Sequence, residues 1–149
     1  MKKFILPSVF AFGSLFSCNN DDNSSIDNAS IVGTWSFVKY QTQFSKDNHM
    51  EDEKLDTCEE KNTLTFTKDN KYSVITYYAD NSGKCILEDN IDATYKATNK
   101  NLVIDWGNND IYEAEIIKLT KNELIIKSDY GEDLDGDGKN EIEILVLKR

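Results

Sequence analysis

Residues 62–78 read NTLTFTKDNKYSVITYY, and this stretch carries the clearest structural signal in the chain. Apolar or aromatic residues alternate with polar ones on both sides of a polar centre, as at Leu64 and Phe66 before it and at Tyr72 after it. A period of two residues places alternate side chains on one face of a β-strand. The centre, residues 68–70 (KDN), contains residue types that tolerate the backbone angles of tight turns. The stretch therefore predicts two antiparallel strands joined by a hairpin.

The same alternation recurs from Ile31 to the C-terminus, with polar turns about every ten residues. No segment shows a sustained apolar stripe with the helical period. We expect the long polar segment 44–61 to be a loop. The expected strands contain residues 35–37, 64–66, 72–78, 92–97, 102–106, 112–116, 124–126 and 142–146. About eight short strands in sequence predict an all-β fold, an eight-stranded up-and-down antiparallel β-barrel, which leaves no free sheet edge; a β-sandwich is the alternative.

Length and composition limit the possible classes of protein. The chain has 149 residues, of which 39% are hydrophobic, so it suits one domain with one core. The formal net charge is -10, which disfavours binding to nucleic acid because phosphates would be repelled. One histidine and three cysteines supply too few ligands for the usual zinc site.

The first 17 residues have the features of an export signal. Lys2 and Lys3 precede a mostly apolar stretch that is too short for a membrane span of ordinary length. It ends in residues 15–18 (LFSC), which resemble a bacterial lipobox. That resemblance implies a lipoprotein signal peptide over 1–17, removed before Cys18, and lipid on the Cys18 thiol, with palmitate among its acyl chains. Two or three acyl chains give a stable membrane anchor where one does not.

The next segment, residues 18–29, is rich in Asn, Asp and Ser and has no apolar period, so we expect a flexible lipidated tether. Residues 30–149 form the folded domain. We expect the protein to be anchored by lipid in the outer membrane of the cell. Asp21 and Asp22 resemble the acidic signals that send some lipoproteins to the outer surface, and whether the domain faces the periplasm or the surface stays open.

Several of these motifs together resemble the lipocalins. Residues 31–35 (IVGTW) look like the Gly-x-Trp opening of the first lipocalin strand, and residues 62–72 and 95–104 look like the hairpins of small lipocalin-like lipoproteins. The resemblance implies a lipocalin-like barrel over 31–149 that binds a small ligand. Lipocalins often pack an arginine over the tryptophan; Arg149 is the only arginine here, and its sequence context does not match theirs.

The cysteines then divide into two groups. With Cys18 carrying lipid, Cys58 and Cys85 are the remaining pair, and export leads to an oxidising compartment, so we predict a disulfide between them. Lipocalin-like lipoproteins often carry such a pair around this hairpin. The bridge would tie the 44–61 loop to the end of the third strand.

Residues 133–141 (DLDGDGKNE) form the strongest chemical motif. The carboxylates of Asp133, Asp135 and Asp137 alternate, the Lys139 carbonyl stands at the position of a backbone ligand, and Glu141 adds a fourth carboxylate. Hard oxygen donors in this number suit Ca²⁺. The spacing resembles the EF-hand loop and, more closely, the calcium loops that join strands in β-propellers. We predict a structural calcium site in a hairpin loop; the alternative is an acidic, glycine-rich turn without a metal.

No motif points to an enzyme. His49 lies among acidic residues in a polar segment and is expected to be a solvated loop histidine, and no nucleophile motif occurs. We expect a monomer that binds a small, apolar ligand in the barrel, with ligand-binding residues unassigned. The alternative is a barrel filled by its own side chains that contacts a protein or glycan through its loops.

Overall fold

A computed structural model describes residues 30–149, and the predicted signal peptide, Cys18 and tether lie outside these described residues. One sheet contains all the strands, in the order β2-β1-β3-β4-β5-β6-β7-β8-β9. The strands are β1 (Gly33–Gln43), β2 (Met50–Lys54), β3 (Thr63–Phe66), β4 (Lys71–Ala79), β5 (Cys85–Ala97), β6 (Asn101–Gly107), β7 (Asp110–Leu119), β8 (Glu123–Asp129) and β9 (Ile142–Lys148). A short 3-10 helix, η1 (Glu59–Lys61), precedes β3.

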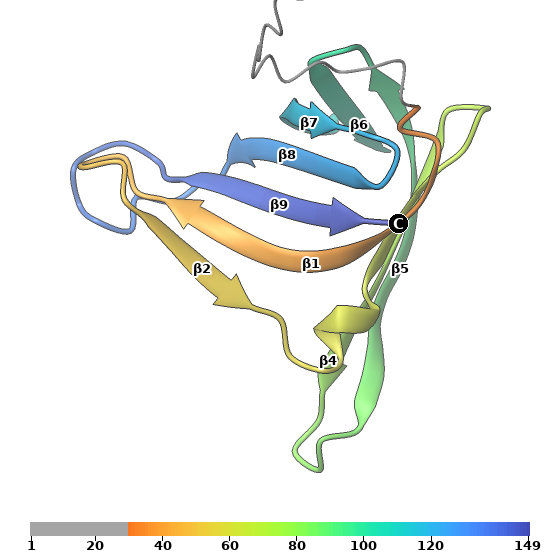
Figure 1. Ribbon diagram of the computed structural model, residues 1–149, viewed down its shortest axis with the longest axis horizontal. Helices are drawn as coiled ribbons and strands as arrows, with labels where there is room; N and C mark the ends of the chain where they lie inside the picture. The colour runs from red at the N-terminus through yellow and green to blue at the C-terminus, as the bar shows by residue number, and fades with distance from the viewer. Residues whose placement is uncertain (1–29) are drawn as a thin grey trace, which may run out of the picture.

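Pairing of β1 with β9 closes the sheet into an antiparallel barrel (Figure 1). Neighbours in sequence pair with one another from β3 to β9, as expected for an up-and-down barrel, and the predicted fold class is confirmed. Strand β1 pairs with three strands. Along one edge its first half pairs with β3 and its second half with β2, and along its other edge it pairs with β9. The barrel therefore contains eight strands, and β2 is an additional edge strand.

Two sequence predictions are wrong in detail. Segment 44–61 is not simply a loop, because it contains β2 and η1; the five residues of β2 are all exposed, so the strand has no apolar alternation to reveal it. Strand β5 begins at Cys85 rather than near residue 92, so Cys85 lies at the start of that strand and not at the end of the preceding one. Residues 88–92 are exposed, and they carry no inward alternation that would have shown the longer strand.

The two ends of the barrel differ. One end, here called the closed end, contains Arg149 and the turns at 67–70, 98–100 and 120–122. The other, here called the open end, contains the connections at 44–49, 80–84, 108–109 and 130–141. Side chains such as Trp35, Phe66, Leu124 and Leu147 are at most 1% exposed and fill the half of the barrel next to the closed end. Towards the open end β4 and β5 project as a long ribbon, here called the arm (Figure 1).

The described residues contain no helix with the length and apolar character needed to cross a bilayer.

Candidate functional site

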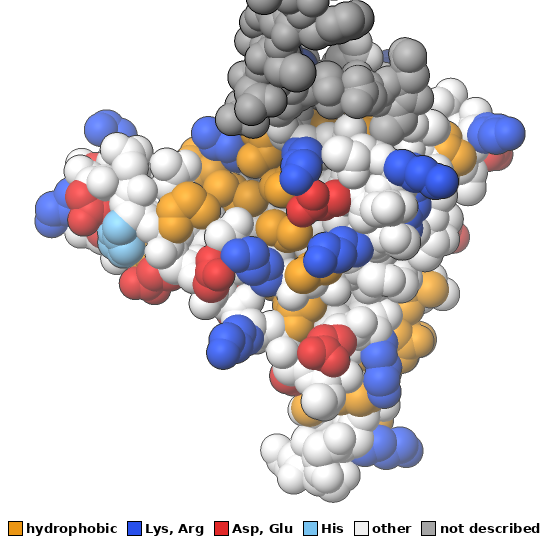
Figure 2. Space-filling view, viewed as in Figure 1, with side chains coloured by type: hydrophobic (Ala, Val, Ile, Leu, Met, Phe, Trp, Pro, Cys, Tyr) orange, Lys and Arg blue, Asp and Glu red, His pale blue; other side chains and the backbone are white. Residues whose placement is uncertain are grey.

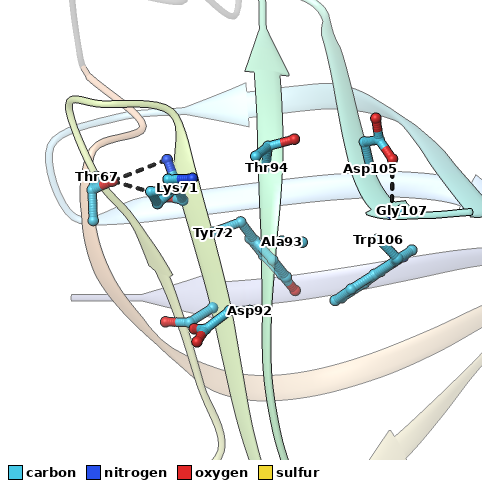
Figure 3. A pocket seen from close by; sticks show the side chains of 10 residues that line it. Thr67, Lys71, Tyr72, Asp92, Ala93, Thr94, Asp105, Trp106 and Gly107 are labelled. Atoms are coloured by element: carbon cyan, nitrogen blue, oxygen red, sulfur yellow. Dashed lines mark hydrogen bonds between the residues drawn. The ribbon is translucent and has the colours of Figure 1, made fainter.

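A cleft of about 640 Å³ lies where β5 and β6 separate. These two strands pair only from Thr94 opposite Asp105 to Ala97 opposite Leu102, so the earlier part of β5 has β4 as its only neighbour among the described strands. The gap exposes inner side chains from the outside of the barrel. Figure 3 shows Tyr72, Ala93 and Trp106 lining this cleft together with polar side chains of the strand edges.

Beside the cleft is a smaller apolar cavity of about 120 Å³ inside the barrel. Tyr72 and Trp106 line both spaces, and their rings meet edge to face with centroids 5.3 Å apart. The other lining residues are Leu64, Ile104, Tyr112, Ile126 and Leu145. The barrel is thus filled near the closed end and keeps an aromatic cavity closer to the open end, beside the cleft.

A polar network lies next to this cavity at the open end. The Tyr112 hydroxyl donates to Ser128 Oγ at 2.9 Å, and the Ser128 hydroxyl is 3.4 Å from the Glu143 carboxylate. Burial raises the pKa of Glu143 above its ordinary value, and the negative charge of Glu53 acts in the same direction. Burial also raises the pKa of Tyr40, with the charge of Glu143 adding to the effect. Acidic side chains therefore lie around Tyr40 at this end.

The acidic loop, residues 130–141 between β8 and β9, brings together part of the predicted metal site. Carboxylate oxygens of Asp133, Asp135 and Glu141 lie within 4.8 Å of one another. Asp133 stabilises the loop conformation, because its two carboxylate oxygens accept from the backbone N–H groups of residues 136, 137 and 138 at 2.7, 3.1 and 2.8 Å. Gly138 has a φ of 88°, a left-handed conformation that glycine adopts without strain.

Glu141 is the most unusual member of the loop because its side chain is completely buried. Its Oε2 accepts from the Leu134 N–H at 2.8 Å, while its Oε1 is buried with no hydrogen-bond partner. A buried carboxylate oxygen without a partner costs free energy unless a cation or a donor compensates it. The arrangement supplies one buried and two more accessible carboxylates to a common point, which is the chemistry of a hard divalent cation.

Asp137 does not join that cluster. The Asp137 carboxylate accepts from the Lys139 N–H at 2.9 Å, and the neighbouring Ser45 hydroxyl lowers the pKa of that carboxyl. The Lys139 side chain is 73% exposed, with its ammonium 4.0 Å from the same carboxylate. The predicted site thus separates into three converging carboxylates and one carboxylate that faces another loop.

The predicted disulfide is present. Cys58 and Cys85 are joined across a sequence separation of 27 residues, and the bridge ties the segment after β2 to the arm. His49 is exposed in the 44–49 connection, as predicted; its ring stacks on Phe44 at 4.2 Å, and Asp47 hydrogen-bonds to it and raises its pKa. Figure 2 shows acidic side chains around the histidine at this end of the molecule.

Sequence reasoning did not identify the residues around the cavity. The alternation predicts that Tyr72 and Trp106 lie on strands, but it does not say where a barrel is filled and where it is hollow. Lys46 contacts Asp135 of the acidic loop across 89 residues of sequence, and neither Lys46 nor its neighbour Ser45 gives a signal in the motif itself.

A family model described as "Lipocalin-like domain" matches residues 31–126. Similar solved structures include a bovine odorant-binding protein, a deswapped triple mutant, with 14% identity, a TM-score of 0.42, and coverage of 78% of this chain and 72% of that chain.

Two further solved structures are similar. A dog lipocalin allergen is 16% identical, with a TM-score of 0.42 over 80% of this chain and 74% of that chain. Apocrustacyanin C2 is 12% identical, with a TM-score of 0.46 over 84% of this chain and 63% of that chain. No curated protein matches the sequence.

Proposed function

The chain belongs to the family of lipocalin-like domains, and from this premise we propose that it is a cell-envelope lipoprotein whose barrel binds a small, largely apolar molecule. The observation that carries the proposal is the aromatic cavity beside the open cleft. Its walls are apolar, and Trp106 is reachable from outside through the gap between β5 and β6. Concave, mostly apolar pockets with a few polar groups are the usual form of small-molecule sites. The proposed role is binding and involves no catalysis.

The volumes of the cavity and the cleft limit the class of ligand. An apolar cavity of about 150 Å³ accommodates benzene, so a cavity of about 120 Å³ suits one ring or a short branched chain. The remainder of the molecule would lie in the larger cleft, whose lining includes the polar side chains of Asp92, Asp105 and Lys71. We therefore propose a ligand with a ring-sized apolar end and a more polar remainder.

Titration with the fluorescent probe N-phenyl-1-naphthylamine tests this site. We expect saturable binding and a Kd about tenfold weaker in Trp106→Ala, because the ring forms a wall of both spaces. Leu87→Ala is the matched control, since Leu87 is 51% exposed on β5 and lines neither space. Absence of saturable binding, or equal Kd values for the two variants, would overturn the proposal. Native mass spectrometry without a co-purified small molecule would then favour the alternative, an interaction module that contacts a protein or glycan.

Anchoring through Cys18 is the second part of the proposal. Ser30 lies at the closed end, where its carbonyl accepts from the Arg149 guanidinium at 3.1 Å. A lipidated segment attached there would place the anchor at the closed end, away from the acidic loop at the open end. Labelling with a palmitate analogue should mark the wild-type protein and not Cys18→Ala; label that persists in the variant would rule out lipid on this residue.

The third part is a structural Ca²⁺ ion in the acidic loop. Asp133, Asp135 and Glu141 would hold the ion, and the unpartnered Oε1 of Glu141 supports this assignment. Sites of this kind outside the cell have Kd values of about 10⁻⁴–10⁻³ M, so 10 mM Ca²⁺ should stabilise the fold by about 1.4–2.7 kcal/mol.

Thermal unfolding in 10 mM Ca²⁺ and in EDTA measures this effect, with an expected rise in Tm of about 3–8 °C. Glu141→Gln should abolish the rise, whereas Glu132→Gln, an exposed change in the same loop, should keep it. Equal Tm values with and without Ca²⁺ in the wild type would eliminate the site.

A further inference from the structure

Two connections that are distant in sequence meet at the open end of the barrel. The tip of the β1–β2 hairpin, residues 44–49, lies beside the acidic loop (Figure 1). The backbone N–H of Lys46 donates to Asp135 Oδ2 at 3.2 Å. Asp135 is also one of the three residues whose carboxylates converge. One side chain therefore belongs both to the candidate cation site and to the contact between the two hairpins.

Ser45 is a second residue of the hairpin tip that lies near the acidic loop. Its hydroxyl lies beside the Asp137 carboxylate, although Ser45 Oγ is buried and completes no hydrogen bond of ordinary geometry. Among the described residues only three buried side-chain polar atoms lack a partner, and two of them, Ser45 Oγ and Glu141 Oε1, belong to this region. The unpartnered Glu141 Oε1 indicates that the acidic-loop side of this contact is incomplete without a further group.

We propose that a divalent cation in the acidic loop holds the tip of the β1–β2 hairpin in place, so that calcium orders one side of the open end. This inference rests on the calcium site proposed above and concerns what the ion does. A cation shared by Asp133, Asp135 and Glu141 would fix the Asp135 carboxylate, whose Oδ2 accepts from the Lys46 N–H. The same loop conformation presents Asp137 to the Ser45 hydroxyl. Without the cation, the crowded negative charges repel one another and the loop loses the geometry that both contacts need.

Strand β2 follows the hairpin tip, and Asp52 ties it to β1 by accepting from Lys39 Nζ at 2.8 Å and from Gln41 Nε2 at 2.6 Å. It is an edge strand that pairs only with β1, over residues 50–54, and all five of its side chains are exposed. Apolar burial therefore contributes almost nothing to keep it in the sheet. After β2, the Cys58–Cys85 disulfide fastens the chain to the arm. The hairpin is thus bound covalently at one side, and the proposed ion secures it at the other.

Hydrogen exchange of the purified chain in Ca²⁺ and in EDTA, followed by mass spectrometry, tests the inference. We expect the amides of residues 44–54 to exchange about tenfold more slowly with Ca²⁺. The amides of the β7–β8 turn, residues 120–123 at the closed end, should be unaffected and serve as the internal reference. Terbium luminescence reports ion binding in the same samples, independently of the hairpin.

The outcomes separate the two proposals. If terbium and Ca²⁺ bind but protect only residues 130–141, the inference is overturned while the metal site stands. If neither ion binds, both fail. If residues 44–54 are protected as expected, the inference is supported.

A serine variant sharpens the test. Ser45→Ala should bind terbium with a Kd within about threefold of wild type, because Ser45 lies outside the carboxylate cluster, and should lose part of the calcium-dependent protection at residues 44–54. Ser82→Ala is the matched control: its hydroxyl donates to Asp80 at 2.6 Å in the other long connection of the open end. Full protection in Ser45→Ala would count against the hydroxyl contact, and equal loss in Ser82→Ala against the specificity of the effect.

Discussion

The two ends of this barrel are stabilised by different means. At the closed end Trp35 is fully buried, and its Nε1 donates to the Ile31 carbonyl at 2.8 Å. The Arg149 guanidinium lies over the indole ring, 4.2 Å from its centroid, and donates to the carbonyls of Ser30, Val32 and Lys121. Gly33 makes room for this arrangement, since a side chain there would begin 2.8 Å from the Arg149 guanidinium.

The open end has no comparable packing. Its long connections are polar, a disulfide joins the arm to the segment after β2, and a carboxylate of the acidic loop is buried with an unpartnered oxygen. A cavity can persist at this end because side chains do not fill it. The comparison shows that the two ends of a small barrel can be stabilised differently. Burial of side chains stabilises the closed end, whereas two local links, the disulfide and the proposed cation, stabilise the open end. Local links allow the end to remain open.

Truncation of one tryptophan at each end gives the largest expected contrast. Trp35→Ala should cost about 3–5 kcal/mol, because a fully buried ring is replaced by a cavity. Trp106→Ala should cost less than half of that, since Trp106 is only partly buried beside an existing space. Urea unfolding measures both. Equal losses at the two ends would contradict the proposed difference in packing.

Removal of the disulfide tests the covalent link of the open end. The bridge closes a loop with a sequence separation of 27 residues, and the chain-entropy relation assigns such a loop about 3.5 kcal/mol. Cys58→Ala combined with Cys85→Ala should lower the free energy of unfolding by about this amount. Cys18→Ala is the control, because it leaves the bridge intact. A loss below about 1 kcal/mol would show that the arm is held by other contacts.

Substitution of Arg149 tests the contacts that its side chain makes at the closed end. Arg149→Ala should cost about 1–2 kcal/mol, from a cation–π contact and from hydrogen bonds to backbone carbonyls. Arg149→Lys should recover less than half of the loss, since an ammonium cannot reach three carbonyls from above the ring as the planar guanidinium does. Full recovery by lysine would mean that charge alone matters there. Chemical unfolding of both variants provides the values.

The fold was largely predictable because its signals are local. The alternation in residues 62–78 and the later strands follows from one face of each strand being buried, and the turns contain the expected residue types. Strand β2 and the first part of β5 could not be found in this way. Both are exposed, and backbone pairing with a neighbouring strand holds them rather than apolar burial.

The site was predictable only where its residues are adjacent in sequence. Asp133, Asp135 and Glu141 converge as their spacing indicates. The contacts of Ser45 and Lys46 with that loop depend on the closure of the barrel by β1 and β9. The sequence also does not predict the packing of Arg149 over Trp35, because the residues around Arg149 do not resemble a lipocalin motif. In the folded chain Arg149 nevertheless lies over the Trp35 ring.

The smallest expected effect concerns Glu143 at the open end, where burial raises the pKa of the carboxyl. A carboxyl with a raised pKa in the folded state contributes stability below its unfolded pKa of about 4.3, and that contribution is lost as the pH rises through the folded pKa. Glu143→Gln stays neutral and should therefore raise the Tm at pH 7 by about 2 °C, with a difference that shrinks towards pH 4.

Glu113→Gln, an exposed change on β7, is the control for Glu143→Gln and should show no such trend with pH. The measurement is a series of thermal unfolding curves between pH 4 and pH 8. A destabilised Glu143→Gln at pH 7 would mean that the ionised carboxylate contributes favourably to this end through its contact with Ser128. Glu143 would then be a satisfied polar group of the open end, and the contrast with the closed end would rest on packing and on the unpartnered Glu141 Oε1.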